Sequence, residues 1–122
     1  MNFWFLIMGA RLSLVGASIH GVYGSRLYME NINNSAMEPL IKSLSLVSWH
    51  VFTIFLLVST FTLGYLAYYP NFSNVAYPII AINLLGAGLF IVLGITNHGA
   101  LLRMPGACLM GGAAVLAWLG IG

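Results

Sequence analysis

Three histidines are the side chains of this sequence best suited to chemistry, and they fall at corresponding places in three apolar segments. His20 lies near the end of the first segment, His50 near the start of the second, and His98 at the end of the third. If these segments run alternately up and down as helices, all three imidazoles lie at one end of the molecule. Imidazole nitrogens bind metals, carry protons and form hydrogen bonds.

Each histidine also shares a helical stripe with small or polar residues. Ionisable groups in membrane spans usually face the interior of the helical assembly or a wet cavity. The stripes hold Ser13, Gly16, Ala17, Gly21 and Gly24 with His20; Thr53, Leu57, Thr60 and Gly64 with His50; and Asn83, Ala87, Phe90 and Gly94 with His98. The pattern therefore predicts that the histidines point inward.

The first hypothesis is that His20, His50 and His98 form a metal or cofactor site. Three imidazoles can bind a zinc or copper ion and leave one position open. Two imidazoles can instead bind a haem iron from its two sides. The further candidate ligands or supporting groups are Asn83, Met104 and Cys108. Met104 and Cys108 are one turn apart on the predicted last helix. Two other interpretations stay open, namely a site for protons or a polar ligand, and histidines that only bond to helix ends and loop carbonyls.

Composition indicates the elements that must position these residues. The chain has 122 residues, of which 61% are hydrophobic and 5% charged, whereas soluble domains carry about 25% charged residues. Long apolar runs of this kind predict membrane-spanning helices. We expect an all-α integral membrane protein, an up-down-up-down four-helix bundle. Residues 1–122 form a single membrane domain, with spans at about 2–24, 44–69, 75–96 and 104–121.

The connections between these spans are mostly short. Residues 25–35 are polar and rich in asparagine, which predicts a loop. Ser35 and Glu38 have the spacing of a capping box, so the second helix is expected to begin near residue 36. At about 1.5 Å per residue, that helix is longer than the hydrocarbon core of a bilayer and should protrude, bend or tilt.

Charge distribution predicts the topology and the partners. Four spans place both termini on one side, and the opposite side carries Arg26, Lys42 and Arg103. The positive-inside rule then places the termini on the side away from the cytoplasm. Arg11 lies on the helical face opposite His20 and either reaches toward the interface or meets another membrane subunit. The partners expected are the lipid bilayer and other membrane proteins, and the few charges disfavour nucleic acid.

The sequence contains no nucleophile–base pair and no paired carboxylates, which disfavours an enzyme. The alternative to a histidine site is a non-catalytic accessory subunit of a larger membrane complex. The segments Ala17–Gly24, Ser48–Thr53 and Asn97–His98 ahead of Pro105 resemble a family of small, uncharacterised four-span bacterial inner-membrane proteins. The resemblance implies an inner-membrane location and supports the three-histidine pattern. Ser25 stands where that family has a glutamate, and Gly21 where it has a serine.

Overall fold

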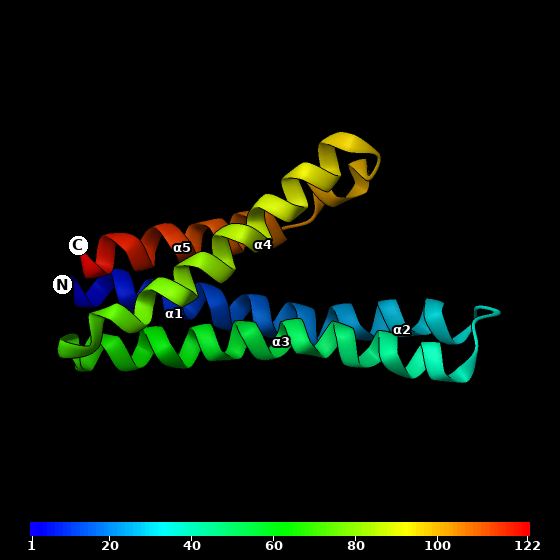
Figure 1. Cartoon of the computed structure of the whole chain (residues 1–122), viewed down its shortest axis with the longest axis horizontal. Coiled ribbons are helices and arrows are strands. Elements are labelled where there is room, and N and C mark those ends of the chain that lie inside the picture. Colours follow the sequence, from blue (N-terminus) through cyan, green and yellow to red (C-terminus); the bar gives the residue numbers. More distant parts are fainter.

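The computed structural model describes residues 1–122 and is helical, without strands (Figure 1). The elements are α1 (Phe3–Ser18), the π-helical segment η1 (Ile19–Gly24), α2 (Ser25–Asn33), α3 (Pro39–Tyr68), the 3₁₀ segment η2 (Pro70–Val75), α4 (Ala76–Thr96), the 3₁₀ segment η3 (Gly99–Arg103) and α5 (Gly106–Ile121). The all-α prediction is confirmed.

The polar stretch after the first apolar segment is helical, so the loop predicted for residues 25–35 is wrong. Its polar side chains bond back to the preceding turn of the same helix. The Ser25 hydroxyl donates to the Gly21 carbonyl at 2.7 Å, and the Asn31 amide donates to the Leu27 carbonyl at 2.9 Å. Side chains bonded in this way do not offer the backbone an alternative to the helix. The connection shrinks to Asn34–Glu38.

The predicted capping box does not form. Glu38 is the N-cap residue of α3, and its side chain makes no capping hydrogen bond. The Ser35 hydroxyl instead donates to the Ile32 carbonyl and accepts from the Met37 backbone amide. Ser35 therefore closes the end of the preceding helix, and Pro39 supplies the start of α3 because proline is favourable in a first turn.

Three helical stretches are long and apolar enough to cross a membrane. They run over Phe3–Asn33, Pro39–Tyr68 and Pro70–Thr96, with 31, 30 and 27 residues. A helix of about 30 residues is roughly 45 Å long, whereas a hydrocarbon core is about 30 Å thick. Helix α5 has 16 residues and is also apolar, but at about 24 Å it is shorter than that core. The chain therefore has the helices of an integral membrane protein.

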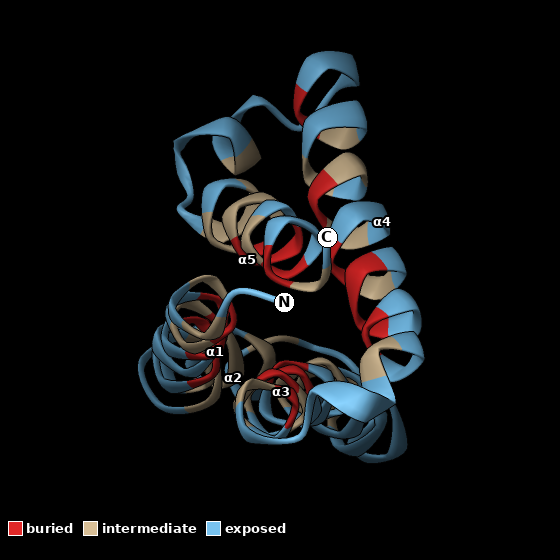
Figure 2. Ribbon diagram, turned by 90° about the vertical axis from the view of Figure 1, so that its left-hand side faces the viewer, coloured by how far each residue is buried: buried red, intermediate tan, exposed pale blue.

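The helices pack as two pairs that separate toward one end. Helix α1 packs against α3 on one side and α5 on the other, and α4 packs against α5. In Figure 1 the two termini lie at the same end, where the α3–α4 connection also lies. Toward the other end the α4–α5 pair turns away from the α1–α2 and α3 pair. The end-on view in Figure 2 shows the buried residues on the inward sides of α1, α3, α4 and α5.

The core consists of two apolar clusters, one above the other along the helices. The termini-side cluster contains Leu6, Ala10, Leu63, Leu66, Ala76, Ile79, Ile80, Ala114 and Ala117. The second cluster, which we call the inner cluster, contains Ala17, Leu56, Ala87 and Met110. Both are built largely from alanine and leucine, and the small residues allow the helices to approach closely.

Between these clusters lies a polar layer formed by Ser13 of α1, Ser59 of α3 and Asn83 of α4. In each of these helices, members of the two clusters are seven residues apart, which is about two turns. The flanking pairs are Ala10 and Ala17, Leu56 and Leu63, and Ile80 and Ala87. Each polar residue occurs between the members of its pair, so all three lie at one level. Ser13 is ten residues after Phe3, which places this layer about 15 Å along the helix from the start of α1.

Candidate functional site

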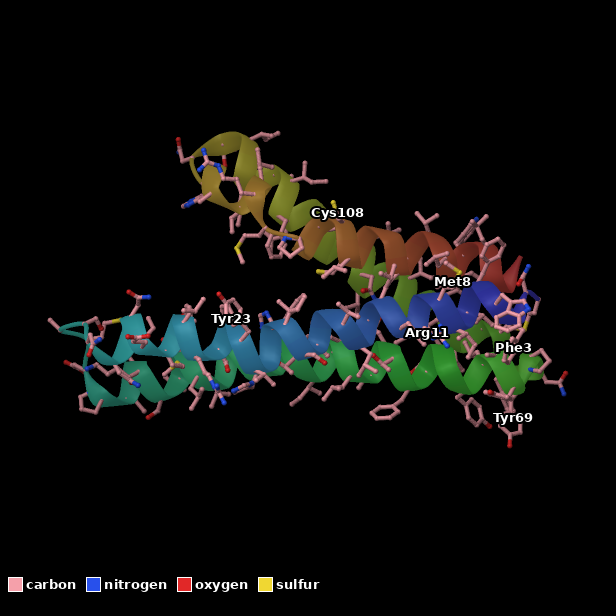
Figure 3. The ribbon with its side chains drawn as sticks, turned by 180° about the vertical axis from the view of Figure 1, so that it is seen from behind. Phe3, Met8, Arg11, Tyr23, Tyr69 and Cys108 are labelled. Carbon is pink, nitrogen blue, oxygen red and sulfur yellow. The ribbon has the colours of Figure 1, made fainter.

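A cleft of about 510 Å³ lies where the two helix pairs separate. One wall comes from α1, η1, α2 and α3, and the other from α4, η3 and α5. Most of its 21 lining residues are hydrophobic. In Figure 3 the side chain of Tyr23 points from the first wall toward the α4–α5 pair. This cleft is of the size and character typical of sites for small, largely apolar molecules.

His20 and Trp49 join the helices of the first wall through two reciprocal hydrogen bonds, an arrangement we call the His20–Trp49 clasp. His20 Nε2 lies 2.9 Å from the Trp49 carbonyl oxygen, and Trp49 Nε1 donates to the His20 carbonyl at 2.8 Å. The two rings stack with centroids 4.1 Å apart and an interplanar angle of 5°. Trp49 also stacks with Tyr28 at 4.4 Å. All three residues line the cleft.

The backbone at His20 is π-helical, and the His20 carbonyl oxygen takes part in both the π-helix and the His20–Trp49 clasp. This carbonyl accepts the backbone N–H of Ser25, five residues along, as well as Trp49 Nε1. Single π-helical turns inside α-helices are rare and are frequently found at functional sites. The sequence analysis did not predict this turn. The sequence feature that could have indicated an irregular turn in Ile19–Gly24 is its two glycines, Gly21 and Gly24.

The clasp also sets the tautomer of the neutral His20 ring. A carbonyl oxygen can only accept, so Nε2 must carry the hydrogen that points to Trp49. In the neutral imidazole the other ring nitrogen, Nδ1, is then an acceptor. The neutral His20 ring then has one acceptor nitrogen left for a further partner, whereas a metal site needs several nitrogens.

The inner part of the cleft meets the polar layer, because Ser13 and Asn83 line the cleft as well. Both residues are almost completely buried, with 2% and 1% of their surfaces exposed. The Ser13 hydroxyl and the Asn83 Oδ1 have no hydrogen-bond partner in the chain. Such atoms are uncommon in folded proteins, and each one calls for an explanation.

The structure does not bring the three predicted ligands together. His20 lies in the clasp, and His50 Nδ1 is 3.4 Å from the Thr53 hydroxyl. His98 is exposed in the α4–η3 connection, on the helix pair that turns away (Figure 1). The chain holds no group of three or more histidine, cysteine or acidic side chains that could bind a metal ion. The predicted three-histidine zinc, copper or haem site is therefore not supported, because the helix pairs diverge at the end where these residues lie.

The supporting ligands proposed from the sequence are also separated. Met104 lies before α5, which begins at Gly106, so Met104 and Cys108 are not one turn apart on one helix. Cys108 is exposed, and Figure 3 shows it on the outer side of the α4–α5 pair. Asn83 does lie at the site, but in the polar layer and not near a histidine cluster.

Two members of the polar layer, Ser13 and Ser59, were missed as functional candidates. The signal that would have found them is a pair of apolar residues seven positions apart, with a polar residue between them, in three separate helices. The resemblance to small four-span membrane proteins stays a prediction. No protein-family model, curated protein or solved structure matches the chain, so the site is characterised by its geometry alone.

Proposed function

We propose that this protein is a four-helix, up-down-up-down membrane protein that binds a largely apolar, membrane-soluble molecule in the cleft between its two helix pairs. The observation that carries this proposal is the cleft of about 510 Å³, whose walls come from the three long helical stretches and from α5. Sites for small molecules commonly combine an apolar lining with a few polar groups that orient the ligand. Here those groups are His20, Ser13 and Asn83.

The position of the cleft suits entry from the bilayer. Tyr23 is 20 residues after Phe3, which is about 30 Å along the helix and therefore near the opposite membrane surface. Tyr23 and Trp49 both line the cleft, and tyrosine and tryptophan are enriched at membrane interfaces. The cleft thus extends from that interface toward the middle of the membrane. A membrane-soluble molecule at this depth can enter the cleft directly from the surrounding lipid.

The proposed topology places both termini in the periplasm of a bacterial inner membrane. Two aromatic pairs near the termini support an interface there: Tyr65 stacks with Tyr69 at 4.5 Å, and Tyr77 contacts Trp118 edge-on at 6.3 Å. The cytoplasmic end then carries Arg26, Lys42 and Arg103, in agreement with the positive-inside rule. In this arrangement α2 and the start of α3 protrude from the membrane.

The proposal is tested by filling the cleft. Gly16 lines it, and a methyl group added there would meet only Leu56 and Leu109, no closer than 3.8 Å. We expect Gly16→Leu to fold and to lower saturable binding of 2-methylnaphthalene at least tenfold, because the leucine occupies the ligand's space. The measurement is equilibrium binding of the radiolabelled probe to protein in lipid nanodiscs, with empty nanodiscs subtracted.

The matched control is Gly64→Leu, since Gly64 has nothing within 4 Å of an added methyl group and does not line the cleft. This variant should bind the probe like the wild type. The proposal is contradicted if the wild type shows no saturable binding above empty nanodiscs. It is also contradicted if Gly16→Leu binds as tightly as Gly64→Leu.

A second candidate function, that of an accessory subunit, is favoured by Arg11. This residue is exposed on α1 about 12 Å from Phe3 along the helix, which is within the hydrocarbon depth. The only acidic residues, Glu30 and Glu38, lie at the far end of the first helix pair. Arg11 therefore has no acidic partner in its own chain, and a charge at this depth usually pairs with another group.

Arg11→Ala should release a partner subunit during mild-detergent co-purification and leave the helical circular dichroism unchanged. Arg26→Ala, on the protruding helix α2, is the control and should keep the partner. If both variants co-purify the same proteins as the wild type, the accessory role loses the observation that favours it. The cleft proposal does not depend on this result.

A further inference from the structure

We infer that the polar layer of Ser13, Ser59 and Asn83 recognises a hydroxyl group on the molecule bound in the cleft. This inference rests on the proposed function and adds the chemical class of the ligand. It starts from the two buried oxygens that have no partner, those of Ser13 and Asn83. Both residues belong to the lining of the cleft, but the two oxygens themselves are covered by neighbouring atoms, so a ligand reaches them by displacing those atoms at the inner end of the cleft.

The Asn83 side chain is held in one orientation. Its amide nitrogen donates to the Ser59 hydroxyl at 3.0 Å and to the Ile79 carbonyl at 2.9 Å, so both of its hydrogens are used. Turning the amide over would place its oxygen against the Ile79 carbonyl. Oδ1 therefore remains the free atom, and because a carbonyl oxygen can only accept, its missing partner must donate.

Ser59 maintains this orientation from α3. Its hydroxyl donates to the Phe55 carbonyl at 2.9 Å and accepts from Asn83. Ser59 does not line the cleft. It is therefore a positioning residue, which directs the Asn83 oxygen without touching the ligand.

Ser13 supplies the complementary half of the recognition. A serine hydroxyl has one hydrogen to donate and lone pairs to accept. A ligand group that donates to Asn83 and accepts from Ser13 must be both donor and acceptor. An alcohol or phenol satisfies this requirement, whereas a ketone or ether only accepts. An ammonium group would bring a charge to mid-membrane, where it is costly.

The depth of the polar layer explains why a ligand is expected to fill this role. The layer is enclosed by the termini-side cluster and the inner cluster, which are apolar. A polar group buried there without a partner is unfavourable, since no bulk water reaches it. A ligand hydroxyl can supply the donor that Asn83 Oδ1 lacks and the acceptor that the Ser13 hydroxyl lacks, so its presence should distinguish this ligand from a hydrocarbon of the same shape.

The experiment compares three naphthalenes of nearly the same shape in the nanodisc binding assay. 2-Naphthol donates and accepts, 2-methoxynaphthalene only accepts, and 2-methylnaphthalene does neither. Wild-type protein should bind 2-naphthol about tenfold more tightly than 2-methylnaphthalene after correction for partition into empty nanodiscs. Binding of 2-methoxynaphthalene should be intermediate, because it pairs with Ser13 and leaves Asn83 Oδ1 unpaired.

Two variants assign the difference to the polar layer. Ser13→Ala and Asn83→Leu should each weaken 2-naphthol binding about tenfold and change 2-methylnaphthalene binding less than twofold. Ser13→Ala keeps the test valid if Asn83→Leu fails to fold, because the Ser13 hydroxyl has no partner in the chain. The control is Ser18→Ala, which removes an exposed hydroxyl of α1 that bonds to the Leu14 carbonyl and lies outside the cleft.

The outcomes separate the inference from the proposed function. If no probe binds the wild type, the proposed function fails and the inference fails with it. If all three probes bind equally, or if Ser13→Ala weakens them equally, the cleft binds apolar molecules but the polar layer holds only a bridging water. That result would overturn the inference and leave the proposed function standing.

Discussion

Replacing Trp49 with alanine should lower the free energy of unfolding by about 3 kcal/mol, the lower end of the range for removing a large aromatic side chain. The substitution removes the hydrogen bond from Trp49 Nε1 to the His20 carbonyl and the stacking with His20 and Tyr28. The bond from His20 to the Trp49 backbone carbonyl remains possible, since it does not use the indole. Unfolding in mixed micelles, followed by circular dichroism, measures the loss.

Two matched variants identify the cause. Trp49→Phe keeps an aromatic ring but loses the indole N–H, so its cost should be only about 1 kcal/mol. Trp118→Ala removes a tryptophan that is 59% exposed on α5 and should cost less than Trp49→Ala. Equal losses for the alanine variants of Trp49 and Trp118 would show that the His20–Trp49 clasp adds nothing beyond the burial of an aromatic ring.

Gly21→Ala should destabilise the protein by about 2 kcal/mol, a typical cost of overpacking. A methyl group built on Gly21 would lie 2.7 Å from Cγ2 of Thr53, well inside ordinary van der Waals contact. Thr53 is β-branched, so its side chain has only two favoured χ1 rotamers within a helix and little freedom to move aside. The added methyl should therefore push η1 away from α3 and strain the clasp, and the same unfolding assay measures the effect.

A second-site change tests this explanation directly. Thr53→Ser removes the methyl group that clashes and keeps the hydroxyl near His50 Nδ1. It should restore most of the stability lost in Gly21→Ala. The control Gly64→Ala, where an added methyl meets nothing within 4 Å, should be neutral or slightly stabilising, because alanine is the better helix former. Failure of Thr53→Ser to rescue Gly21→Ala would mean that the close approach of η1 and α3 is not the cause.

The sequence by itself determined the features that depend on neighbouring residues along the chain. Long apolar runs predict spanning helices because each backbone polar group in lipid must be paired within its own segment. The prolines at Pro39, Pro70 and Pro105 lie at or next to the starts of helical segments, where the ring does not break a backbone hydrogen bond. His20 and Asn83 were recognised as candidates because polar side chains are rare in such segments.

Some local features could not be predicted because two outcomes have similar local energies. The polar residues of α2 are as compatible with a loop as with a helix, and the outcome follows from packing of α2 on α3. The π-helical turn at His20 likewise coincides with its bonds to Trp49, a residue 29 positions away. A local pattern holds no information about such a partner.

The position of the site was decided only by the tertiary structure. Helical periodicity predicts inward faces for His20, His50 and His98, but it does not state the angle between helices or where each helix ends. Because the α4–α5 pair turns away from the first pair, His98 separates from His20, and a cleft opens where a histidine cluster was expected. The same packing brings Ser13, Ser59 and Asn83 to one level, since the two apolar clusters that flank them hold these helices in register on either side.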